Sequence, residues 1–472
     1  MQDRLPSSGQ KQKVFVIGID CAEPSLVFGP WRDDLPNLRK LMQAGTYGNL
    51  ESCIPCITVP AWACMLSGKD PGQLGLYGFH NRVDHSYQQM RVANSKALNA
   101  PLVWDYLSRV GKEVVIVGVP PSYPPRPVNG VMVGCFLTPD TGTDYTYPSS
   151  VAQEIKSHVG EYPVDVLQFR TLDKEHLLKQ VHDMTDKHFC AIEYLMKKRS
   201  WDFFMFVEIG MDRIHHGMWR YHDSTHPGYE PDSPFKTAVY EYYRYIDERV
   251  GKLLDLLDED TAVLVVSDHG CKQMKGGINL NEWLIQEGYL VLKKQPDGTT
   301  ELEDCEIDWK HTRAWGGGGY YGRVFMNVRG REPQGIIDPS EYEGVRNELV
   351  KNLESLADPQ GLPMDTHAFK PQDIYRECRG IPPDLIVYFS QLEWRALGTV
   401  GSGRVHTFEN DKGPDSANHS PAGMLIYYDP RRPGRGHVSG TSLLDIGPGL
   451  MHLMGLPIPG NLAGRVPPFI LS

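Results

Sequence analysis

Four runs of mostly apolar residues are the clearest pattern in the chain. They have little polar alternation, which is typical of strands that are buried on both faces of a parallel sheet. The four runs cover residues 13–20, 113–119, 201–210 and 261–270. Two weaker runs, Asp384–Phe389 and Gly423–Asp429, are further strand candidates.

Helical patterns lie between these runs. Residues 36–45 begin with a proline and end with a glycine, as helices often do. Residues 236–259 place apolar side chains three and four positions apart, the spacing of an amphipathic helix. Strands that alternate with helices predict right-handed crossovers. The pattern therefore predicts an α/β fold, a doubly wound and mostly parallel central sheet flanked by helices.

The strand runs also suggest how the chain is divided. Residues 277–418 interrupt them with a mixed pattern of their own, and we predict an inserted cap there, partly joined to the core. The core is predicted over 11–276 and 419–472, and 1–10 are expected to be a flexible N-terminus. The segment 145–200 is a second candidate insertion.

Composition and charge restrict the partners. Of the 472 residues 40% are hydrophobic and 23% charged, so a packed globular protein is expected. The net charge of −11 argues against a broad nucleic-acid surface, although metal ions could still bind a small phosphate ester. No apolar run is long enough to span a membrane, and the first residues lack the apolar stretch of a secretory signal. Nine cysteines, an odd number, are interpreted as reduced thiols of a cytoplasmic protein. The oligomeric state is not predicted.

Potential metal ligands gather where the apolar runs end. Any one of them could instead be a helix cap or a turn residue. Three aspartates and three histidines at strand ends or in loops suit two divalent ions held by mixed nitrogen and oxygen ligands. They are Asp20 after the first run, Asp212 and His216 after the third, Asp268 and His269 in the fourth, and His419 before the last.

The spacing of these residues adds two conditions. Asp212 and His216 are four positions apart, so one helical turn would place both on one face. Asp268 and His269 are adjacent and would point to opposite faces of a strand. They can converge only where the strand ends, and Gly270 permits such a turn.

Thr58 is a candidate nucleophile. It precedes Pro60 at the start of an apolar helical run, which places it near a helix N-terminus that favours anions. Thr58 could also be only the N-cap of that helix. A hydroxyl that attacks phosphorus needs activation, and no Ser-His-Asp order or G-x-S-x-G motif is present, so metal activation is the consistent alternative. Cys56 is not followed by the C-x5-R phosphate loop.

Taken together, Asp20, "TVPAW", "MDRIHH", "SDHG" and "NHSPAG" resemble the alkaline phosphatase superfamily. The likeness is greatest to its type I phosphodiesterase and nucleotide pyrophosphatase branch, and it extends from Lys13 to about Arg465. The resemblance implies two zinc ions about 4 Å apart, with manganese or iron as alternatives. It implies that Asp212, His216 and His419 hold one ion, and that Asp20, Asp268, His269 and the nucleophile Thr58 hold the other.

The substrate-binding residues are less well defined by this resemblance. The position of the family's phosphate-binding asparagine corresponds to Phe79. Either Asn81 replaces that asparagine or this phosphate contact is absent. No arginine typical of a sulfatase or monoesterase is evident near Thr58 in the sequence. In the cap, Trp315, Tyr320, Arg323 and His406 could bind substrate or could be structural.

The function expected from this resemblance is a phosphodiesterase or nucleotide pyrophosphatase that forms a phospho-threonine intermediate. Its substrate would be a small phosphate ester or a nucleotide. The alternatives are a phosphomonoesterase, a phosphonate monoesterase or a sulfatase on the same scaffold. A phosphomutase and a non-catalytic ligand-binding protein are further alternatives.

Overall fold

A ten-stranded sheet forms the centre of the computed structural model, which describes residues 12–471. The five central strands β9, β1, β8, β5 and β6 run parallel, whereas β19 and β7 are antiparallel to their neighbours. In spatial order the strands are β20 (Gly436–His437), β2 (Thr46–Glu51), β19 (Ala422–Tyr428), β9 (Ala262–Val266), β1 (Val14–Ile19), β8 (Phe203–Glu208), β5 (Val114–Val117), β6 (Gly130–Val133) and β7 (Thr146–Tyr147); β21 (Thr441–Ser442) also pairs with β2.

The four apolar runs form four of the five parallel strands. Every residue of β1, β5, β8 and β9 is buried, as the lack of polar alternation predicts. The weak run 423–429 becomes β19 of the same sheet. The predicted α/β fold with a mostly parallel central sheet is therefore confirmed.

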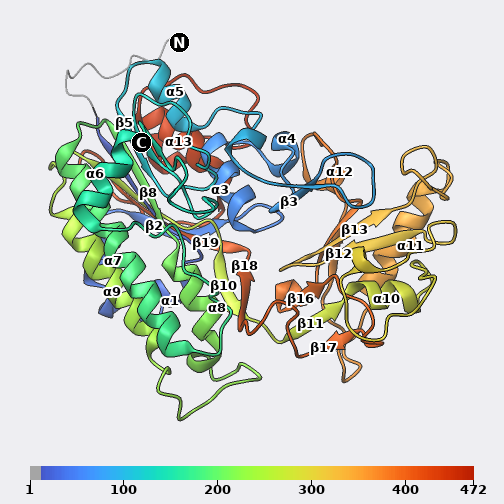
Figure 1. Cartoon of the computed structure of the whole chain (residues 1–472). Coiled ribbons are helices and arrows are strands. Elements are labelled where there is room, and N and C mark those ends of the chain that lie inside the picture. The colour runs from blue at the N-terminus through green and yellow to red at the C-terminus, as the bar shows by residue number, and fades with distance from the viewer. Residues whose placement is uncertain (1–11, 472) are drawn as a thin grey trace.

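Helices cover both faces of the sheet (Figure 1). Successive residues of β1 point to opposite faces, so Phe15, Ile17 and Ile19 pack into one helical layer and Val14 and Val16 into the other. The first layer contains α1 (Pro24–Val27), α2 (Pro36–Ala44), α6 (Ser150–Val159), α7 (Lys174–Lys198), α8 (Gly210–His222) and α9 (Ala238–Leu254). The second contains α3 (Thr58–Ser67), α4 (Pro71–Leu74), α5 (Val103–Arg109), α13 (Ile446–Leu453) and α14 (Pro468–Leu471).

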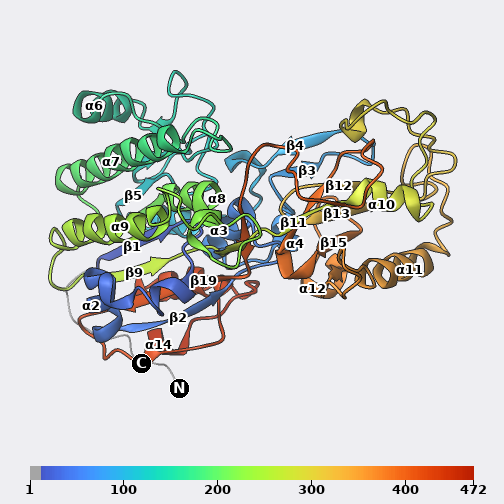
Figure 2. The same ribbon diagram turned by 90° about the horizontal axis from the view of Figure 1, so that it is seen from below.

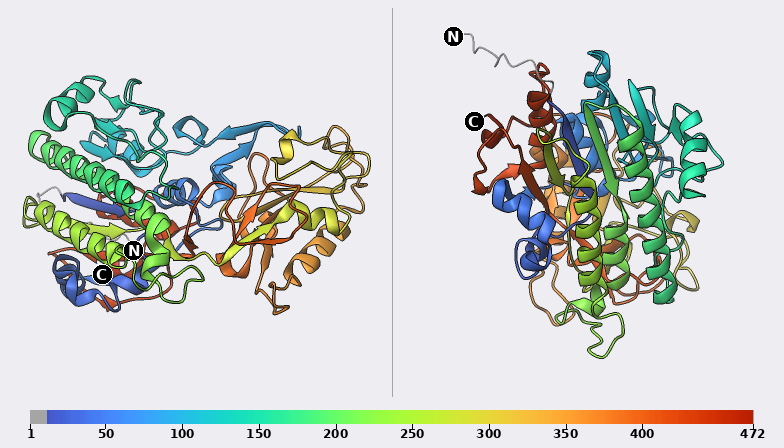
Figure 3. Two further views of the ribbon diagram at one scale, coloured as in Figure 1. Left: turned by 60° about the horizontal axis from the view of Figure 1, so that its bottom comes forward. Right: turned by 90° about the vertical axis from the view of Figure 1, so that its left-hand side faces the viewer.

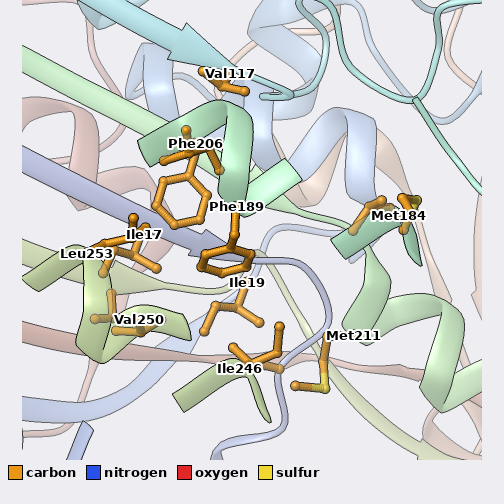
Figure 4. Packing of buried hydrophobic residues seen from close by; sticks show 14 of the residues in the cluster. Ile17, Ile19, Val117, Met184, Phe189, Phe206, Met211, Ile246, Val250 and Leu253 are labelled. Carbon is orange, nitrogen blue, oxygen red and sulfur yellow. The ribbon is translucent and has the colours of Figure 1, made fainter. Parts of the chain in front are cut away.

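The predicted amphipathic helices use their apolar faces in the first layer. Helices α2 and α9 coincide with the patterns at 36–45 and 236–259, although α9 ends earlier, at Leu254. Figure 4 shows Ile246, Val250 and Leu253 of α9 packed near Ile17 and Ile19 of β1. Burial of each such side chain stabilises the folded protein by about 1.5–3 kcal/mol.

The segment 145–200 is part of the core, so its interpretation as an inserted unit is wrong. Helix α7 lies beside α8 and α9 over the sheet (Figure 2). Its residues Leu177, Val181 and Leu195 are buried in the same cluster as β1. The apolar face of this helix is complementary to the sheet, which could not be inferred from the local pattern.

A second group of elements follows β9 and lies to one side of the central sheet (Figures 1 and 3). The antiparallel pair β10 (Gly270–Gln273) and β18 (Ala417–Ser420) connects it to the core. We call residues 277–418 the cap. The weak run 384–389 becomes β15 here and not in the central sheet.

The cap has its own apolar core between sheet and helix. One sheet contains β11 (Gly276–Asn279), β16 (Trp394–Leu397) and β17 (His406–Thr407); the other contains β12 (Ala314–Gly317), β13 (Gly322–Met326), β15 (Leu385–Tyr388) and β14 (His367–Phe369). The helices are α10 (Leu280–Gln286), α11 (Tyr342–Glu354) and α12 (Pro371–Ile374). The hairpin β3 (His80–Arg82) and β4 (Met90–Val92) lies next to the cap (Figure 2).

Two predictions on cellular context concern the cysteines and the membrane. All nine cysteines are free thiols, and the cytoplasmic location inferred from them stays a prediction. Over residues 12–471, none of the helices has the length and apolarity that a bilayer crossing requires. The predicted flexible N-terminus, 1–10, lies outside the described residues.

Candidate metal centre and active-site pocket

The predicted ligands come from elements whose ends meet at one edge of the central sheet. Strand β1 lies between β8 and β9, so the carboxyl ends of these three parallel strands are adjacent. Asp20 follows β1, Asp268 and His269 follow β9, and Asp212 lies in the first turn of α8 after β8. His419 arrives from β18, on the strand pair that leads to the cap.

One cluster of donors surrounds His269. Its Nε2 lies 3.2 Å from Asp268 Oδ2, 3.8 Å from Asp20 Oδ1 and 3.3 Å from Thr58 Oγ1. Each of the four side chains is at least 96% buried. Adjacent residues of a strand would point to opposite faces, but the turn between β9 and β10 brings Asp268 and His269 to the same side.

A second cluster surrounds Asp212. Its Oδ1 lies 3.3 Å from His216 Nε2 and 3.8 Å from His419 Nε2. The rings of His269 and His419 stack with centroids 3.8 Å apart, so the two clusters share a border. His269 is close enough to Asp212 and His419 to complete a donor group with them. The structure thus brings all six predicted ligands and Thr58 together.

Several polar atoms of these residues are buried and form no hydrogen bond. Within residues 12–471, four of its atoms have no hydrogen-bond partner: Asp20 Oδ1, Asp268 Oδ2, His216 Nε2 and His419 Nε2. Buried polar atoms are nearly always satisfied. Carboxylate oxygens and imidazole nitrogens are ligands of zinc and of related divalent ions, so the residues present fit such ions.

The opposite nitrogen of each histidine is held by the protein. His269 Nδ1 lies 3.1 Å from the Gly270 carbonyl oxygen, His419 Nδ1 lies 2.9 Å from that of Cys56, and His216 Nδ1 lies 2.8 Å from Asp415 Oδ1. Trp62 Nε1 donates to Asp20 Oδ2 at 2.8 Å. Such contacts fix the ring orientation and leave Nε2 free to bind a cation.

Burial shifts the pKa values of several side chains in the two clusters. Burial and neighbouring carboxylates raise the pKa values of Asp20 and Asp268 well above the usual range. Burial also lowers the pKa of His269 to about 4. Asp212 differs, because His216 and Arg213 outweigh its burial and lower its pKa. Divalent cations would favour the ionised carboxylates and the neutral imidazoles.

Thr58 is the first residue of α3, and Ile57 is the N-cap. The interpretation of Thr58 as only a cap therefore does not describe its side chain, which faces His269. The first backbone N–H groups of a helix have no partner within it, and the helix dipole favours an anion there. A group bound beside Thr58 is thus placed near both the donor clusters and the start of α3.

A cavity of about 370 Å³ opens at Thr58, Asp212 and His419. It adjoins a cavity of about 860 Å³ between the cap and the β3–β4 hairpin. The two share five lining residues: His80, Gly318, Gly319, Arg323 and Arg395. Aromatic rings from Phe79, Phe136, Phe169 and Tyr320 form part of the wall of the smaller cavity.

Four arginines line the smaller cavity, although none is near Thr58 in the sequence. Arg170 pairs with Asp415, and Arg395 pairs with Asp411. Arg213 donates to both oxygens of Asp165 and also to Asp212. Among the described residues, the guanidinium of Arg323 has only the carbonyl oxygens of His80 and Gly318 as hydrogen-bond partners.

The predicted substrate-binding residues divide into two groups. Phe79, Tyr320 and Arg323 line the smaller cavity, and Trp315 lines the larger one with Arg323. Asn81 instead stabilises its own turn: its Oδ1 accepts from the Tyr77 N–H, and its Nδ2 donates to the Gly78 carbonyl.

His406 has a comparable structural contact. Its Nε2 lies 2.8 Å from the Ala357 carbonyl oxygen, within the cap and outside both cavities. Neither Asn81 nor His406 is therefore brought to the pocket, because local backbone groups satisfy their side chains.

Two residues of the site, Asp415 and Arg213, were not identified by the sequence analysis. Asp415 binds His216 and Arg170, and Tyr320 Oη donates to Asp415 Oδ2 at 3.1 Å. The Tyr320 ring stacks on His216 with centroids 4.8 Å apart. Asp415 is only four positions before His419, and Arg213 follows Asp212, but neither ends a strand run. Their position near known candidates was the only available signal.

The family model described as type I phosphodiesterase / nucleotide pyrophosphatase matches residues 14–415. None of the curated proteins compared with the chain matches it. Among solved structures, human ectonucleotide pyrophosphatase/phosphodiesterase 5 has a TM-score of 0.54 at 15% identity, covering 95% of this chain and 97% of that one. The murine protein, in an inactive form in complex with AMP, has a TM-score of 0.53 at 13% identity, covering 96% and 98%.

Proposed function

Because the chain belongs to the type I phosphodiesterase/nucleotide pyrophosphatase family and is thus a hydrolase of phosphodiester or pyrophosphate bonds, we propose that Thr58 is its nucleophile. In this proposal two divalent ions complete the active site. The observation that carries the proposal is the position of Thr58 Oγ1, 3.3 Å from His269 Nε2 and at the wall of a substrate-sized cavity.

Asp20, Asp268, His269 and Thr58 would hold one ion, and Asp212, His216 and His419 the other. The unpartnered atoms of Asp20, Asp268, His216 and His419 support this division. Mixed imidazole and carboxylate ligands favour Zn²⁺, with Mn²⁺ or iron as alternatives. When bound, the ions would supply positive charge for the phosphate oxygens and lower the pKa of the Thr58 hydroxyl.

The Thr58 hydroxyl gives its proton to solvent, and its oxygen forms a bond to phosphorus in line with the leaving oxygen, whose bond to phosphorus breaks. The leaving group departs with the electron pair of that bond, and the phosphoryl group remains on Thr58. Free N–H groups at the start of α3 stabilise the negative charge beside it. A water oxygen then bonds to phosphorus as the bond between phosphorus and Thr58 Oγ1 breaks, and the Thr58 oxygen takes up a proton again. Two in-line displacements give net retention at phosphorus.

The two adjoining cavities support a substrate with groups on both sides of the phosphorus. A nucleotide is a suitable small molecule, and the AMP complex of the murine structural neighbour supports this choice. The smaller cavity would hold the part next to Thr58. The larger cavity, which Trp315 and Arg323 line, would hold the group on the other side of the phosphorus.

A monoesterase, phosphonate monoesterase or sulfatase is the alternative, and the arginines of the pocket are the observation that favours it. These enzymes must bind a compact anion whose charge is not shielded by a second ester group. However, Arg170, Arg213 and Arg395 are already paired with carboxylates. Their charge is largely compensated, so a diester or pyrophosphate substrate is favoured.

A comparison of rates tests this choice. The substrates are bis-p-nitrophenyl phosphate, p-nitrophenyl phosphate, a nucleotide p-nitrophenyl ester and p-nitrophenyl sulfate. We expect the two diesters to react fastest, and we expect a chelator to abolish turnover and Zn²⁺ to restore it. A monoester or sulfate that reacts tenfold faster, about 1.4 kcal/mol in the barrier, would favour the alternative.

A further inference from the structure

A second group of potential ligands lies beside the candidate active site. The sulfur atoms of Cys21 and Cys271 and a ring nitrogen of His215 all lie within 4.8 Å of one another. All three side chains are at least 97% buried. Neither thiol has a role in the proposed hydrolysis.

The group is directly connected to the residues of the catalytic clusters. Cys21 follows Asp20, His215 precedes His216, and Cys271 is two positions after His269. Cys271 pairs with His419 in the β10–β18 ladder. The same three chain segments therefore supply carboxylate and imidazole donors to the catalytic clusters, and two thiols and a further imidazole to this group.

The ring nitrogens of His215 are the polar atoms of this group that are buried without a hydrogen bond. Within the described chain, neither of its ring nitrogens forms a hydrogen bond of normal geometry, although the Cys21 carbonyl lies close to the ring. Its neighbours are the rings of Trp219 and Tyr243, at centroid distances of 5.1 and 5.6 Å. A buried imidazole without a hydrogen bond is costly, and a bound ion would satisfy it.

Cys21 has a φ angle of +65°, in the left-handed region that glycine adopts readily and that other residues seldom adopt. This conformation directs its N–H toward Asp268 Oδ1, at 3.4 Å. Glycine would satisfy the backbone equally well, so the backbone alone does not explain a cysteine here. The backbone conformation does not require the thiol of Cys21, so the thiol needs a separate explanation.

We propose that Cys21, Cys271 and His215 bind a thiophilic metal ion, with Zn²⁺ as the favoured ion, in a site separate from the catalytic clusters. Two thiolates and a neutral imidazole would balance the charge of Zn²⁺, which suits a site surrounded by Trp219, Ala417 and Leu26. The Gly270 carbonyl oxygen, 3.4 Å from Cys21 Sγ, is available as a further donor.

The site would also support the catalytic clusters. The same Gly270 carbonyl lies 3.1 Å from His269 Nδ1 and orients that ring. This carbonyl belongs to the peptide that links Gly270 to Cys271, and Cys21 Sγ lies 3.4 Å from it, so an ion held by both thiols would fix the turn that carries His269. Its role is structural, since none of its three ligands lines the pocket at Thr58.

X-ray absorption at the zinc edge tests the site in the unaltered full-length protein. The catalytic clusters contain no sulfur ligand, so Zn–S scattering at about 2.3 Å can come only from a thiolate site. We expect such scattering and about three ions per chain. A spectrum with only nitrogen and oxygen neighbours would overturn the proposal, whatever the turnover of the sample.

Cobalt substitution gives a second, independent test. Thiolate ligands give Co²⁺ a near-ultraviolet charge-transfer band that carboxylates and imidazoles do not. The band should lose intensity in Cys21→Gly, which keeps the left-handed backbone favourable, and in Cys271→Ala, since each variant keeps one thiolate. It should disappear when both cysteines are replaced. It should remain in Cys135→Ala, a matched control that removes another buried thiol.

Two results would contradict this assignment. One is a charge-transfer band that keeps its full intensity in both Cys21→Gly and Cys271→Ala. The other is a mass two hydrogens lower for the isolated unreduced protein, with a linked Cys21–Cys271 peptide after digestion. That mass would assign the pair to a disulfide instead of a metal site.

Discussion

The hydroxyl oxygen of Thr58 lies 3.3 Å from Nε2 of His269, although the two residues are 211 positions apart in the chain. Thr58 begins α3 and His269 ends the turn after β9, so the contact joins a helix N-terminus to the edge of the sheet. Of the seven predicted residues, Thr58 is the one with a hydroxyl oxygen, and it lies at a helix N-terminus.

Replacing Thr58 with alanine should reduce turnover by roughly 10³-fold or more, because the variant loses the hydroxyl that forms the bond to phosphorus. Thr58→Ser should keep measurable activity, since only a methyl group is lost. Steady-state rates with bis-p-nitrophenyl phosphate would measure both. Metal content and circular dichroism should be unchanged in each variant. Full turnover by Thr58→Ala with its metals bound would show that water attacks directly.

Asp415 should act as a positioning residue for the metal centre. Asp415 Oδ1 lies 2.8 Å from His216 Nδ1, and Asp415 Oδ2 lies 2.9 Å from Arg170 Nε. Asp415 does not belong to either donor cluster. Asp415→Asn should weaken metal binding by about 10–100-fold, because the carboxylate no longer fixes the imidazole. Competition with a chelator would measure this affinity.

Asp429→Asn is the matched control for that experiment. Asp429 is a buried carboxylate that pairs with Arg431 and Arg432 at the end of β19 and does not contact the clusters. Its replacement should change the free energy of unfolding without changing the affinity for metal. Equal losses of affinity in the two variants would show a general effect of destabilisation.

Arg323 should contribute to specificity for charged leaving groups. Its guanidinium lines both cavities and has no carboxylate partner among the described residues. Arg323→Ala should lower kcat/KM for a pyrophosphate-linked nucleotide by about 10–150-fold, the loss of one charged hydrogen bond of about 1.5–3 kcal/mol. The rate with bis-p-nitrophenyl phosphate should change little.

An exposed arginine provides the comparison for Arg323. Arg329 pairs with Asp338 on the cap surface and lines neither of the two connected cavities. Arg329→Ala should leave both rates unchanged. If Arg323→Ala affected the two substrates equally, the residue would contribute to the pocket's structure and not to selection of the leaving group.

The buried pair of His188 and Glu208 should make stability depend on pH. His188 Nδ1 lies 3.1 Å from Glu208 Oε2, and its Nε2 lies 2.7 Å from the Pro163 carbonyl oxygen. Burial opposes the charged imidazole, but Glu208, the Pro163 carbonyl and Asp165 outweigh it and raise the pKa of His188 above 6.5.

The sign of the effect follows from proton linkage. The folded protein holds this proton more tightly than the unfolded chain, so the stabilisation is complete below about pH 6.5 and is lost as pH rises through the folded pKa. Urea unfolding of the metal-loaded protein should show a falling midpoint over that range. In His188→Gln the decline should be smaller. An equally steep decline would assign it to other groups.

Local sequence was sufficient for the parts of the fold that depend on a single strand or helix. The apolar runs at 13–20 and 261–270 identified β1 and β9, because strands buried on both faces have no polar face. The polar residues that end such runs must leave the sheet at its carboxyl edge. For this reason Asp20, Asp268 and His269 could be proposed as neighbours before their positions were known.

Only the tertiary structure decided which residues surround those ligands. Asp415 and Arg213 become part of the site through contacts with His216 and Asp212, and the helical layer over the sheet makes 145–200 part of the core. His406 has a chemically suitable side chain, yet a cap carbonyl satisfies it. Strand burial is encoded in consecutive residues. The partner of a polar side chain depends instead on contacts between distant segments, which local patterns do not specify.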